Sequence, residues 1–560
     1  MANLVFSLME AIAHRAKANF LQQLSQADRV QTAFLRSLLT AHQHTEFGQT
    51  YQLGDIHTPD QFRERVPIAS YQDFLPAIER MAHGEANVLV ADPLIFMNLT
   101  SGSTGPKKLI PVTRRSRRAI ARANRAAMGF LFDAARREGR PLGKMLFNSS
   151  ASSMGKTSGG IAYGPVSTSD LRLSNFLYRQ VFAYPFEVLQ VADSPSRHYL
   201  CLLFALGQPH LRVISATFPV LALQLASYLE KYADSLIDDL ATGAIAPWLV
   251  LKPEQRLKLE RQWAAQPQRA QQLRTIFKRE GRLTPILAWP GLSFMVTARG
   301  GTSDFYFKRF SEYFGDTPVF GGIYSSAEAT YGIHRDFNTD SVLLALNSGF
   351  YEFIPENQWE VTNPETVLPW EVTPGDRYRI VVTNYSGFYR YDVGDVVEVE
   401  GFTGNTPRFT FRHRRGGIIS STTEKTTEFH VVQTLQRLQQ EFNLQLEQFC
   451  ITLAEDVIPA PYLVNIELAA GSHLTQPEAF RQRFDAVLQE VNASYAAKRA
   501  DHQVPAPRLR ILAPGSFAAL RQRMIQQGTL ESQIKFPLVT ENRAWLAGLL
   551  VEHEVRAEEG

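Results

Sequence analysis

The sequence predicts an α/β protein with two domains. The larger N-terminal domain, residues 1–418, combines α/β sheets with an attached β region, and the smaller C-terminal domain, residues 419–560, is α+β. Helical and strand-like segments alternate through the first half of the chain, which is typical of α/β domains. Short apolar strands with hairpin-like spacing follow from Arg282 onward. After Gly417 the alternation resumes over about 140 residues, enough to bury a separate core.

The N-terminal domain starts with a helical segment, residues 6–42, in which apolar residues recur at helical spacing. Three more helices are expected at 114–138, 193–206 and 219–241, with a strand at 211–216. The strands expected after Arg282 are 285–289, 294–298, 319–324, 341–355, 377–384, 396–400 and 408–413. The Ser- and Gly-rich segment 148–170 is typical of a mobile or ligand-lining loop.

In the C-terminal domain, the expected helices are 425–444, 477–498 and 516–528, and the expected strands are 448–454, 463–469 and 508–512. The pair Gly416-Gly417 stands beside basic residues where the two domains meet. Such a pair suits a hinge, which would make the C-terminal domain mobile, and it suits a hairpin turn equally well.

The composition argues against several classes of protein. The 58 Lys and Arg residues balance 55 Asp and Glu residues, and a net charge of +3 is unlike that of a dedicated nucleic-acid binder. No apolar run reaches the ~20 residues of a membrane span, and the start of the chain lacks the order of a signal peptide. Cys201 and Cys450 are expected to be buried free thiols. We therefore expect a cytoplasmic protein that binds neither membrane nor nucleic acid. The oligomeric state stays open, and a monomer is compatible with the sequence.

A loop rich in hydroxyls and glycines follows the apolar run that ends at Met97. Behind Thr100 it contains Ser101, Gly102, Ser103, Thr104 and Gly105, and then two lysines, Lys107 and Lys108. Backbone N–H groups and hydroxyls of such a loop can approach phosphate oxygens closely, because glycine permits unusual backbone angles. The loop is not a Walker A motif. Taken alone, it is also compatible with a polar turn between two strands.

Two further motifs carry candidate binding residues. In the first, Tyr324 can stack on a flat base, Ser325 and Ser326 can bond polar edges, and Glu328 can hold a divalent cation near phosphates. In the second, Asp395 follows Gly394 at the mouth of a strand, where a carboxylate can accept two ribose hydroxyls. Each motif also has a purely structural explanation. The first is compatible with a strand that runs into a turn of small residues, and in the second Asp392 or Asp395 could simply pair with Arg390.

The order and spacing of the three motifs resemble the adenylate-forming superfamily of acyl-CoA synthetases, peptide-synthetase adenylation domains and luciferases. More closely, the chain resembles a bacterial-type member of the Gretchen Hagen (auxin-responsive) family of acyl acid amido synthetases. The resemblance extends from about residue 30 to 540 and includes the segments 67–73, 289–292, 300–324, 424–426 and 515–517. Three departures stand out: Ala327 replaces a serine, Glu424 replaces an aspartate, and Pro106-Lys107 reverses the usual Lys-Pro order of bacterial relatives.

The resemblance implies a role for each motif residue. Ser101, Ser103 and Thr104 would contact the triphosphate of ATP with Lys108 nearby, although the reversed Pro-Lys order leaves Lys107 as the alternative. Tyr324, Ser325 and Ser326 would line the adenine, and Phe411 would lie beside the nucleotide. Glu328 would help to place Mg²⁺, and Asp395 would hold the ribose. Lys425 would reach the nucleotide from the hinge region, and Lys535 would stabilise charge during acyl-phosphate transfer.

The implied reaction is an ATP-dependent ligation. A carboxylic acid is adenylated with release of pyrophosphate, and an amine, expected to be an amino acid, then takes the acyl group to form an amide. The acyl pocket would draw on segments 172–186 and 298–303, including Arg172, Phe176, Leu177 and Thr302, and an aromatic stripe of this kind also suits a core. The alternatives are an acyl-CoA synthetase-like ligase that uses a thiol acceptor and a non-catalytic protein that binds a carboxylate or a nucleotide. The sequence does not identify the acid or the amine.

Overall fold

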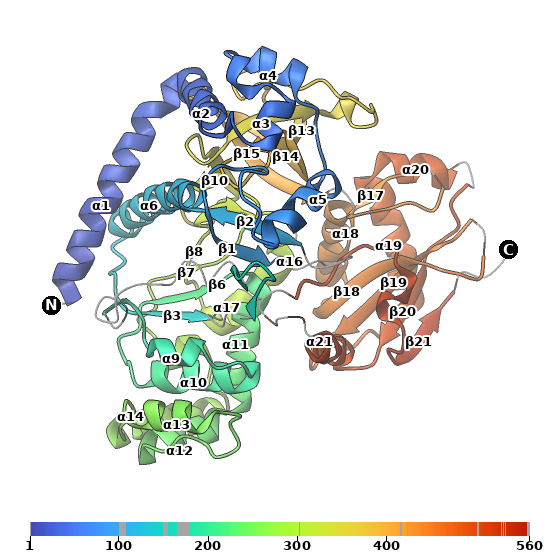
Figure 1. The fold of residues 1–560 in the computed structure, drawn as a ribbon. Helices are drawn as coiled ribbons and strands as arrows, with labels where there is room; N and C mark the ends of the chain where they lie inside the picture. The colour runs from blue at the N-terminus through green and yellow to red at the C-terminus, as the bar shows by residue number, and fades with distance from the viewer. Residues whose placement is uncertain are drawn as a thin grey trace. The chain divides into compact units, whose positions relative to one another are not determined.

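The computed structural model describes most of the chain and divides it into two compact units, each described here by itself (Figure 1). The described residues are 2–99, 108–148, 155–164, 178, 180–301, 303–414, 417–422, 424–457, 459–500, 503–527, 529, 531 and 534–556. The first unit holds the described residues as far as Phe411 except 394–396, and the second unit holds those three and the residues from Arg412 onward. The domain division after residue 418 that the sequence suggests stays a prediction.

The first unit opens with two long helices, α1 (Ala2–Gln23) and α2 (Ala27–His42), joined by the 3-10 turn η1 (Leu24–Gln26). Helix α1 packs along α6 (Arg114–Arg137), whose start is capped by Thr113 through a hydrogen bond from the Ser116 N–H (Figure 1). Gly129 makes this packing close, because a Cβ atom there would lie 2.5 Å from the carbonyl oxygen of Ala13. The helices predicted over 6–42 and 114–138 are thus confirmed, the first with a break at η1.

A seven-stranded sheet dominates the first unit, in the order β12-β13-β14-β15-β11-β10-β9. Its strands are β9 (Ile323–Ser325), β10 (Thr330–His334), β11 (Ser341–Leu344), β12 (Phe350–Pro355), β13 (Arg377–Thr383), β14 (Tyr391–Thr403) and β15 (Thr406–Arg414). The single strand expected over 341–355 is wrong, because residues 345–349 turn between β11 and β12. The strand expected over 319–324 is also two strands, β8 (Val319–Phe320) and β9.

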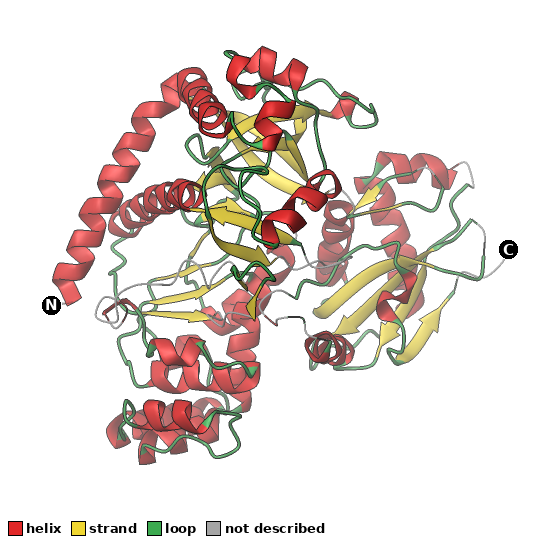
Figure 2. Ribbon diagram, viewed as in Figure 1, coloured by secondary structure: helices red, strands yellow, loops and turns green. Residues whose placement is uncertain are grey.

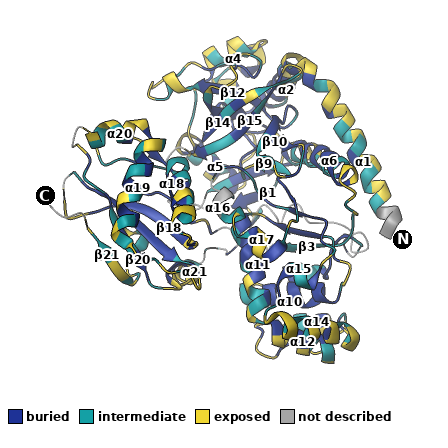
Figure 3. Cartoon of the chain, turned by 180° about the vertical axis from the view of Figure 1, so that it is seen from behind, coloured by how far each residue is buried: buried dark blue, intermediate teal, exposed yellow. Residues whose placement is uncertain are grey.

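A second sheet of the first unit is parallel, in the order β3-β6-β7-β8, from β3 (Met145–Asn148), β6 (Val213–Ala216) and β7 (Phe294–Val296) to β8. Its core includes α10 (Ser194–Leu206), in which every residue from Ser196 onward is buried (dark blue in Figure 3). The helix expected over 219–241 is interrupted at Tyr232, between α11 (Pro219–Lys231) and α12 (Ala233–Thr242). The strand expected over 285–289 is wrong: Pro285 begins a short helix, α15 (Pro285–Ala288).

The remaining elements of the first unit include a small sheet, β2-β1-β5-β4, that flanks the hydroxyl-rich loop. Its strands are β1 (Leu94–Leu99), β2 (Leu109–Thr113), β4 (Gly155–Lys156) and β5 (Ala162–Gly164). The further helices and 3-10 turns are α3 (Glu46–Thr50), η2 (Leu53–Asp55), α4 (Pro59–Arg65), α5 (Tyr71–Ala82), α9 (Phe186–Leu189), α13 (Pro253–Glu260), α14 (Pro267–Glu280), α16 (Ser303–Phe307), α17 (Phe310–Phe314) and η3 (Glu356–Gln358).

The second unit is α+β, as the sequence predicts, with helices packed on a four-stranded sheet (Figure 2). The sheet order is β18 (Leu446–Leu453), β19 (Tyr462–Leu468), β20 (Arg508–Leu512) and β21 (Val551–Val555), and the last strand was not expected. The other elements are β16 (Ile418–Ile419), β17 (Thr426–Thr427), α18 (Glu428–Glu441), α19 (Pro477–Val491), α20 (Ala493–Ala500), α21 (Ser516–Gln526) and η5 (Arg543–Leu546).

Two helix predictions in the second unit need correction. The helix expected over 425–444 begins later, at Glu428, because the Thr427 side chain caps it by accepting from the His430 N–H. The helix expected over 477–498 is divided at Asn492, whose side chain accepts from the Tyr495 N–H at 3.1 Å and so caps α20. In both places a polar side chain satisfies helix N–H groups and sets the boundary.

Cys201 and Cys450 are free and buried, as predicted. Burial raises the pKa of both thiols, that of Cys201 to about 12. Within the described part of the chain, no helix combines the length and the apolar character needed to span a bilayer.

Candidate functional site

The first part of the candidate site is the hairpin of β9 and β10, which carries the predicted adenine motif. The ring of Tyr324 lies 5.4 Å from the ring of Phe411 and 5.0 Å from that of Tyr331, measured between centroids. The carbonyl oxygen of Phe411 accepts a hydrogen bond from the N–H of Gly301 at 3.1 Å, which fixes this end of β15. The structure therefore brings Tyr324 and Phe411 together from distant parts of the sequence.

The two serines of the motif differ in their surroundings. Ser325 is exposed at the end of β9. The Oγ atom of Ser326 forms a 2.7 Å hydrogen bond with the hydroxyl of Tyr331 and accepts from the N–H of Glu328 at 3.2 Å. Ser326 thus holds the turn that presents Glu328, whereas Ser325 faces outward from the same turn.

Glu328 is buried, with 8% of its surface exposed. Its carbonyl oxygen accepts from the side-chain amide of Asn384 at 2.9 Å, and its Oε1 atom lies 3.5 Å from the hydroxyl of Tyr391. No group of three or more metal-binding side chains occurs among the residues that the structure describes. A single carboxylate still fits Mg²⁺, because this ion commonly binds one or two carboxylates together with substrate phosphates and water.

Lys108 lies over the ring of Tyr71, a residue whose pKa is influenced by the charge of Glu328. Its ammonium group sits 4.8 Å from the ring centroid of Tyr71, whose hydroxyl is bonded to the backbone of Leu109 at 3.0 Å. Burial raises the pKa of Tyr71 to about 12, and the negative charge of Glu328 adds to this shift. The side chains of Lys108, Tyr71 and Glu328 therefore share one neighbourhood. Ser101, Gly102, Ser103, Thr104, Gly105 and Lys107 lie outside the described residues.

Asp395, the predicted ribose ligand, belongs to the second unit and is 3% exposed. Its Oδ1 atom accepts a hydrogen bond from Nε of Arg414 at 2.5 Å. The alternative in which Asp392 or Asp395 pairs with Arg390 is wrong, since Asp392 faces Arg379 at 3.4 Å. Arg414 is a candidate that sequence reasoning missed, although it stands in the basic run beside the Gly-Gly pair.

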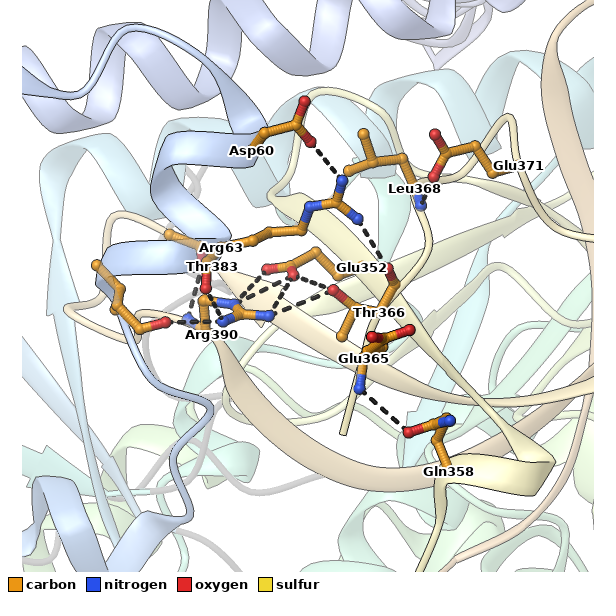
Figure 4. A network of polar contacts seen from close by, with 11 residues as sticks. Asp60, Arg63, Glu352, Gln358, Glu365, Thr366, Leu368, Glu371, Thr383 and Arg390 are labelled. Atoms are coloured by element: carbon orange, nitrogen blue, oxygen red, sulfur yellow. Dashed lines mark hydrogen bonds and ion pairs between the residues drawn. The ribbon is translucent and has the colours of Figure 1, made fainter. Parts of the chain in front are cut away.

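Arg390 instead anchors the start of β14 (Figure 4). Its guanidinium bonds both carboxylate oxygens of Glu352 at 2.8–3.1 Å, and its Nη1 atom donates to the carbonyl oxygens of Arg63 and Val66 at 2.7 Å. Its backbone has a positive φ of 46°, which is unusual for a residue other than glycine. This network fixes the chain immediately before Tyr391, the residue that contacts Glu328.

Lys425 is exposed on a turn of the second unit that a buried glutamate holds in place. The carboxylate of Glu424 accepts from the N–H groups of Ser421 and Thr422 at 2.6 and 3.0 Å, and from the hydroxyl of Tyr462 at 2.8 Å. Burial raises the pKa of Glu424, but these hydrogen bonds outweigh it and leave the pKa below its usual value. Glu424 therefore fixes the backbone that immediately precedes Lys425.

Lys535 is exposed between two buried neighbours, Ile534 and Phe536. The ring of Phe536 packs against that of Phe517, with 5.4 Å between centroids. The backbone of the following residues is bonded to β18, since Ile451 donates to the carbonyl oxygen of Leu538 at 2.8 Å. Lys535 thus projects from an anchored segment of the second unit.

The predicted acyl pocket is only partly visible. Arg172, Phe176, Leu177 and Thr302 lie outside the described residues, and so does Leu173. Phe182 and Tyr184, which the sequence also suggests for the slot, are 4% and 3% exposed and belong to the core of the parallel sheet. Phe182 stacks on Tyr178 with 4.3 Å between ring centroids. For these two residues, the core alternative is correct.

Family models match most of the chain. The GH3 family N-terminal domain matches residues 16–319, the GH3 family central domain matches residues 342–414, and the GH3 family C-terminal domain matches residues 429–544.

Individual relatives agree with these matches. The chain is 27% identical over 545 residues to a jasmonoyl–L-amino acid synthetase (JAR4) of Nicotiana attenuata, covering 91% of each protein. It is 25% identical over 560 residues to the indole-3-acetic acid-amido synthetase GH3.3 of Arabidopsis thaliana, covering 92% of this chain and 90% of the relative. Among solved structures, the GH3.15 acyl acid amido synthetase has a TM-score of 0.84 at 23% identity, with 97% of each chain covered. A 2-hydroxyisobutyryl-CoA ligase in its postadenylation state shares the fold more distantly, with a TM-score of 0.55 at 13% identity over 93% of this chain and 90% of the ligase.

Proposed function

Because the chain belongs to the Gretchen Hagen (GH3) family of acyl acid amido synthetases, we propose that its motif residues activate a carboxylic acid with ATP. The chain is a ligase that adenylates an acid and conjugates it to an amino acid. The observations that carry the residue assignment are the contact between the rings of Tyr324 and Phe411 and the burial of Glu328, four residues after Tyr324.

This geometry supports the nucleotide roles that we propose. Tyr324 and Phe411 offer aromatic surface to the adenine, and exposed Ser325 offers a hydroxyl to its edge. Asp395 bonds the ribose hydroxyls. Ser101, Gly102, Ser103, Thr104 and Gly105 surround the triphosphate, with Lys108 as the lysine nearest to it.

In the first half-reaction, the substrate carboxylate attacks the α-phosphorus of ATP, and pyrophosphate leaves. Glu328 would hold Mg²⁺, which supplies charge neutralisation for the phosphates when it is bound. Lys535 and Lys425 stabilise the negative charge that develops in the transition state. In the second half-reaction, the amine attacks the acyl carbonyl, an amide bond forms, and AMP leaves.

Several finer points belong to the same proposal. The acid is hydrophobic or aromatic, with Arg172, Phe176, Leu177 and Thr302 in its pocket. The chain is a bacterial-type member of the family, although its Pro106-Lys107 reverses the usual order of bacterial relatives. A cytoplasmic location suits two unpaired cysteines, and the C-terminal domain is expected to be mobile.

An acid-dependent pyrophosphate-exchange screen tests the proposal. We expect at least one aromatic or hydrophobic acid to drive exchange of labelled pyrophosphate into ATP. An amine screen on the positive acids, with coenzyme A in parallel, should release AMP only with amino acids. AMP release with coenzyme A alone would favour the acyl-CoA ligase, and ATP binding without exchange on any acid would favour a non-catalytic protein.

A further inference from the structure

Glu428, the first residue of α18, connects two segments of the second unit through separate hydrogen bonds. Its backbone N–H donates to the carbonyl oxygen of Gly417 at 3.0 Å. Its Oε1 atom accepts from the backbone N–H of Leu538 at 3.0 Å. One residue therefore bonds both the glycine-containing segment near the unit boundary and the segment that carries Lys535.

The Lys535 segment is held on one side by β18 and on the other by Glu428. Ile451 bonds it twice, because its N–H donates to Leu538 and its carbonyl oxygen accepts from Thr540 at 3.0 Å. Without the Glu428 carboxylate, the N–H of Leu538 would lose this acceptor, and a buried donor without an acceptor is costly. The position of the Lys535 backbone thus depends on the Glu428 carboxylate.

Gly417 leaves no spare room for this carboxylate. A Cβ atom added at Gly417 would lie 3.1 Å from Cδ and 3.2 Å from Cγ of Glu428. A methyl group there would force the Glu428 side chain to shift, and the shift would be passed to Leu538. The Glu428 side chain is therefore confined from one side and bonded on the other.

The start of α18 does not need the Glu428 carboxylate. Thr427 already caps the helix, because its side chain accepts from the N–H of His430 and the His430 side chain accepts from the N–H of Thr427. The Glu428 side chain is directed instead to the Lys535 segment. Burial raises the pKa of Glu428 above its usual value, and the positive charges of Lys535 and Arg414 partly oppose this shift.

We propose that Glu428 is a positioning residue for Lys535 in the adenylation half-reaction, acting through the bond to Leu538 and confined by Gly417. The inference rests on the proposed function, since it requires Lys535 to act on the acyl-phosphate transition state. It adds a residue that does not itself touch the substrate.

Steady-state pyrophosphate exchange with the full chain tests this role. Glu428→Ala removes the acceptor of the Leu538 N–H and should lower kcat for exchange at least about tenfold, because a displacement of ~1 Å at a catalytic group can cost on the order of 100-fold. The KM for ATP should change less than about threefold, since Lys535 acts mainly in the transition state. With preformed acyl-adenylate and amine supplied, the rate of amide formation should stay near that of the wild type. An equal loss in both half-reactions would overturn the proposal.

Double variants separate positioning from a general structural role. In a Lys535→Ala background, Glu428→Ala should cause no further loss of exchange, because its effect passes through Lys535. Gly417→Ala should reproduce the exchange defect, and the Gly417→Ala/Glu428→Ala pair should be no worse than Glu428→Ala alone. Fully additive losses in both double variants would overturn the proposal.

Asp485→Ala supplies the matched control. Asp485 is also a buried carboxylate of the second unit, with the Tyr495 hydroxyl at 2.8 Å and Nε of Arg499 at 2.9 Å, and these partners lie outside the Lys535 segment. Amide hydrogen exchange over residues 534–540 should accelerate in Glu428→Ala and stay unchanged in Asp485→Ala. If the wild type shows no acid-dependent pyrophosphate exchange, the proposed function fails. If the wild type shows it and Glu428→Ala matches the wild type, only the present inference fails.

Discussion

Asp395 and Arg414 form an ion pair in which only the carboxylate is buried. The side chain of Asp395 is 4% exposed and that of Arg414 is 52% exposed, with 2.5 Å between Oδ1 and Nε. The carboxylate is therefore held in one orientation by a partner that remains accessible to solvent. An oriented carboxylate can accept two neighbouring hydroxyls at little further entropic cost.

Asp395→Ala should weaken the use of ATP. The loss of even one hydrogen bond to a charged acceptor, about 1.5–3 kcal/mol, corresponds to a rise of at least about tenfold in the KM for ATP. Acid-dependent pyrophosphate exchange measures this change. Asp392→Asn is the control in the same motif, because Asp392 faces Arg379 and should leave the KM for ATP almost unchanged. Unchanged exchange kinetics in Asp395→Ala would contradict the ribose assignment.

Glu352→Gln should destabilise the first unit strongly. Glu352 and Arg390 have side chains that are 1% and 6% exposed, so the change would leave a buried guanidinium without its counter-charge. Removal of one partner of a buried pair costs about 3–5 kcal/mol, and urea denaturation followed by fluorescence would measure the shift in midpoint. Glu398→Gln breaks the more exposed pair with Arg377 and should cost at most about 1 kcal/mol. Equal losses of stability in Glu352→Gln and Glu398→Gln would contradict the prediction that the buried pair contributes more than the exposed pair.

Gly321→Ala should disturb the hairpin that carries Tyr324. A Cβ atom at Gly321 would lie 2.3 Å from Nε2 of His334, a buried ring whose Nδ1–H donates to the carbonyl oxygen of Thr339. Burial lowers the pKa of His334 to about 4, so the ring is neutral at pH 7. Overpacking of this kind costs about 1–3 kcal/mol and should lower the melting temperature.

Gly54→Ala is the comparison for this prediction. Its Cβ atom would meet only the flexible Gln43 side chain, at 3.0 Å, so its melting temperature should remain close to that of the wild type. If Gly321→Ala melted at the wild-type temperature with an unchanged KM for ATP, the hairpin would tolerate a methyl group at that position.

The contribution of Glu424 to stability should disappear in acid. Its pKa is below the usual value in the folded protein, so its contribution is present above the unfolded pKa, about 4.3, and is lost as the pH falls through the folded pKa. Glu424→Gln should therefore lower the free energy of unfolding in urea at pH 7 by about 1–3 kcal/mol, and have a smaller effect near pH 3.5. If the stability of Glu424→Gln differed from that of the wild type by the same amount across this pH range, the prediction would be contradicted.

The motifs predict the main candidate residues because each motif is a local pattern. Tyr324 to Glu328 and Gly394-Asp395 could be read from the sequence, and the family resemblance added Phe411, Lys425 and Lys535 to the predicted site. Long elements with strong periodicity were also predictable, such as the helix at 114–138 and the strand at 508–512. Local patterns were sufficient for these.

Other features depend on contacts that no local pattern reveals. Glu352 stands in an apolar strand, and nothing near it in the sequence indicates that Arg390 is its partner. Arg414 reads as one of several basic residues, and its pairing with Asp395 appears only when β14 and β15 are adjacent. The helix at Pro285 was predicted as a strand, because a short apolar run is compatible with both structures. The proline at its first position favours the start of a helix, and the prediction did not take it into account.

The buried thiols make this protein well suited to spectroscopic labelling. The chain contains two cysteines in all, and maleimide reagents need an accessible thiolate, which neither Cys201 nor Cys450 provides. Cysteines introduced at Leu257 in the first unit and Leu550 in the second, residues that are 55% and 70% exposed, would accept a pair of fluorophores without background. Energy transfer between the dyes could then follow the two units through a complete catalytic cycle, in a chain that retains both of its native cysteines.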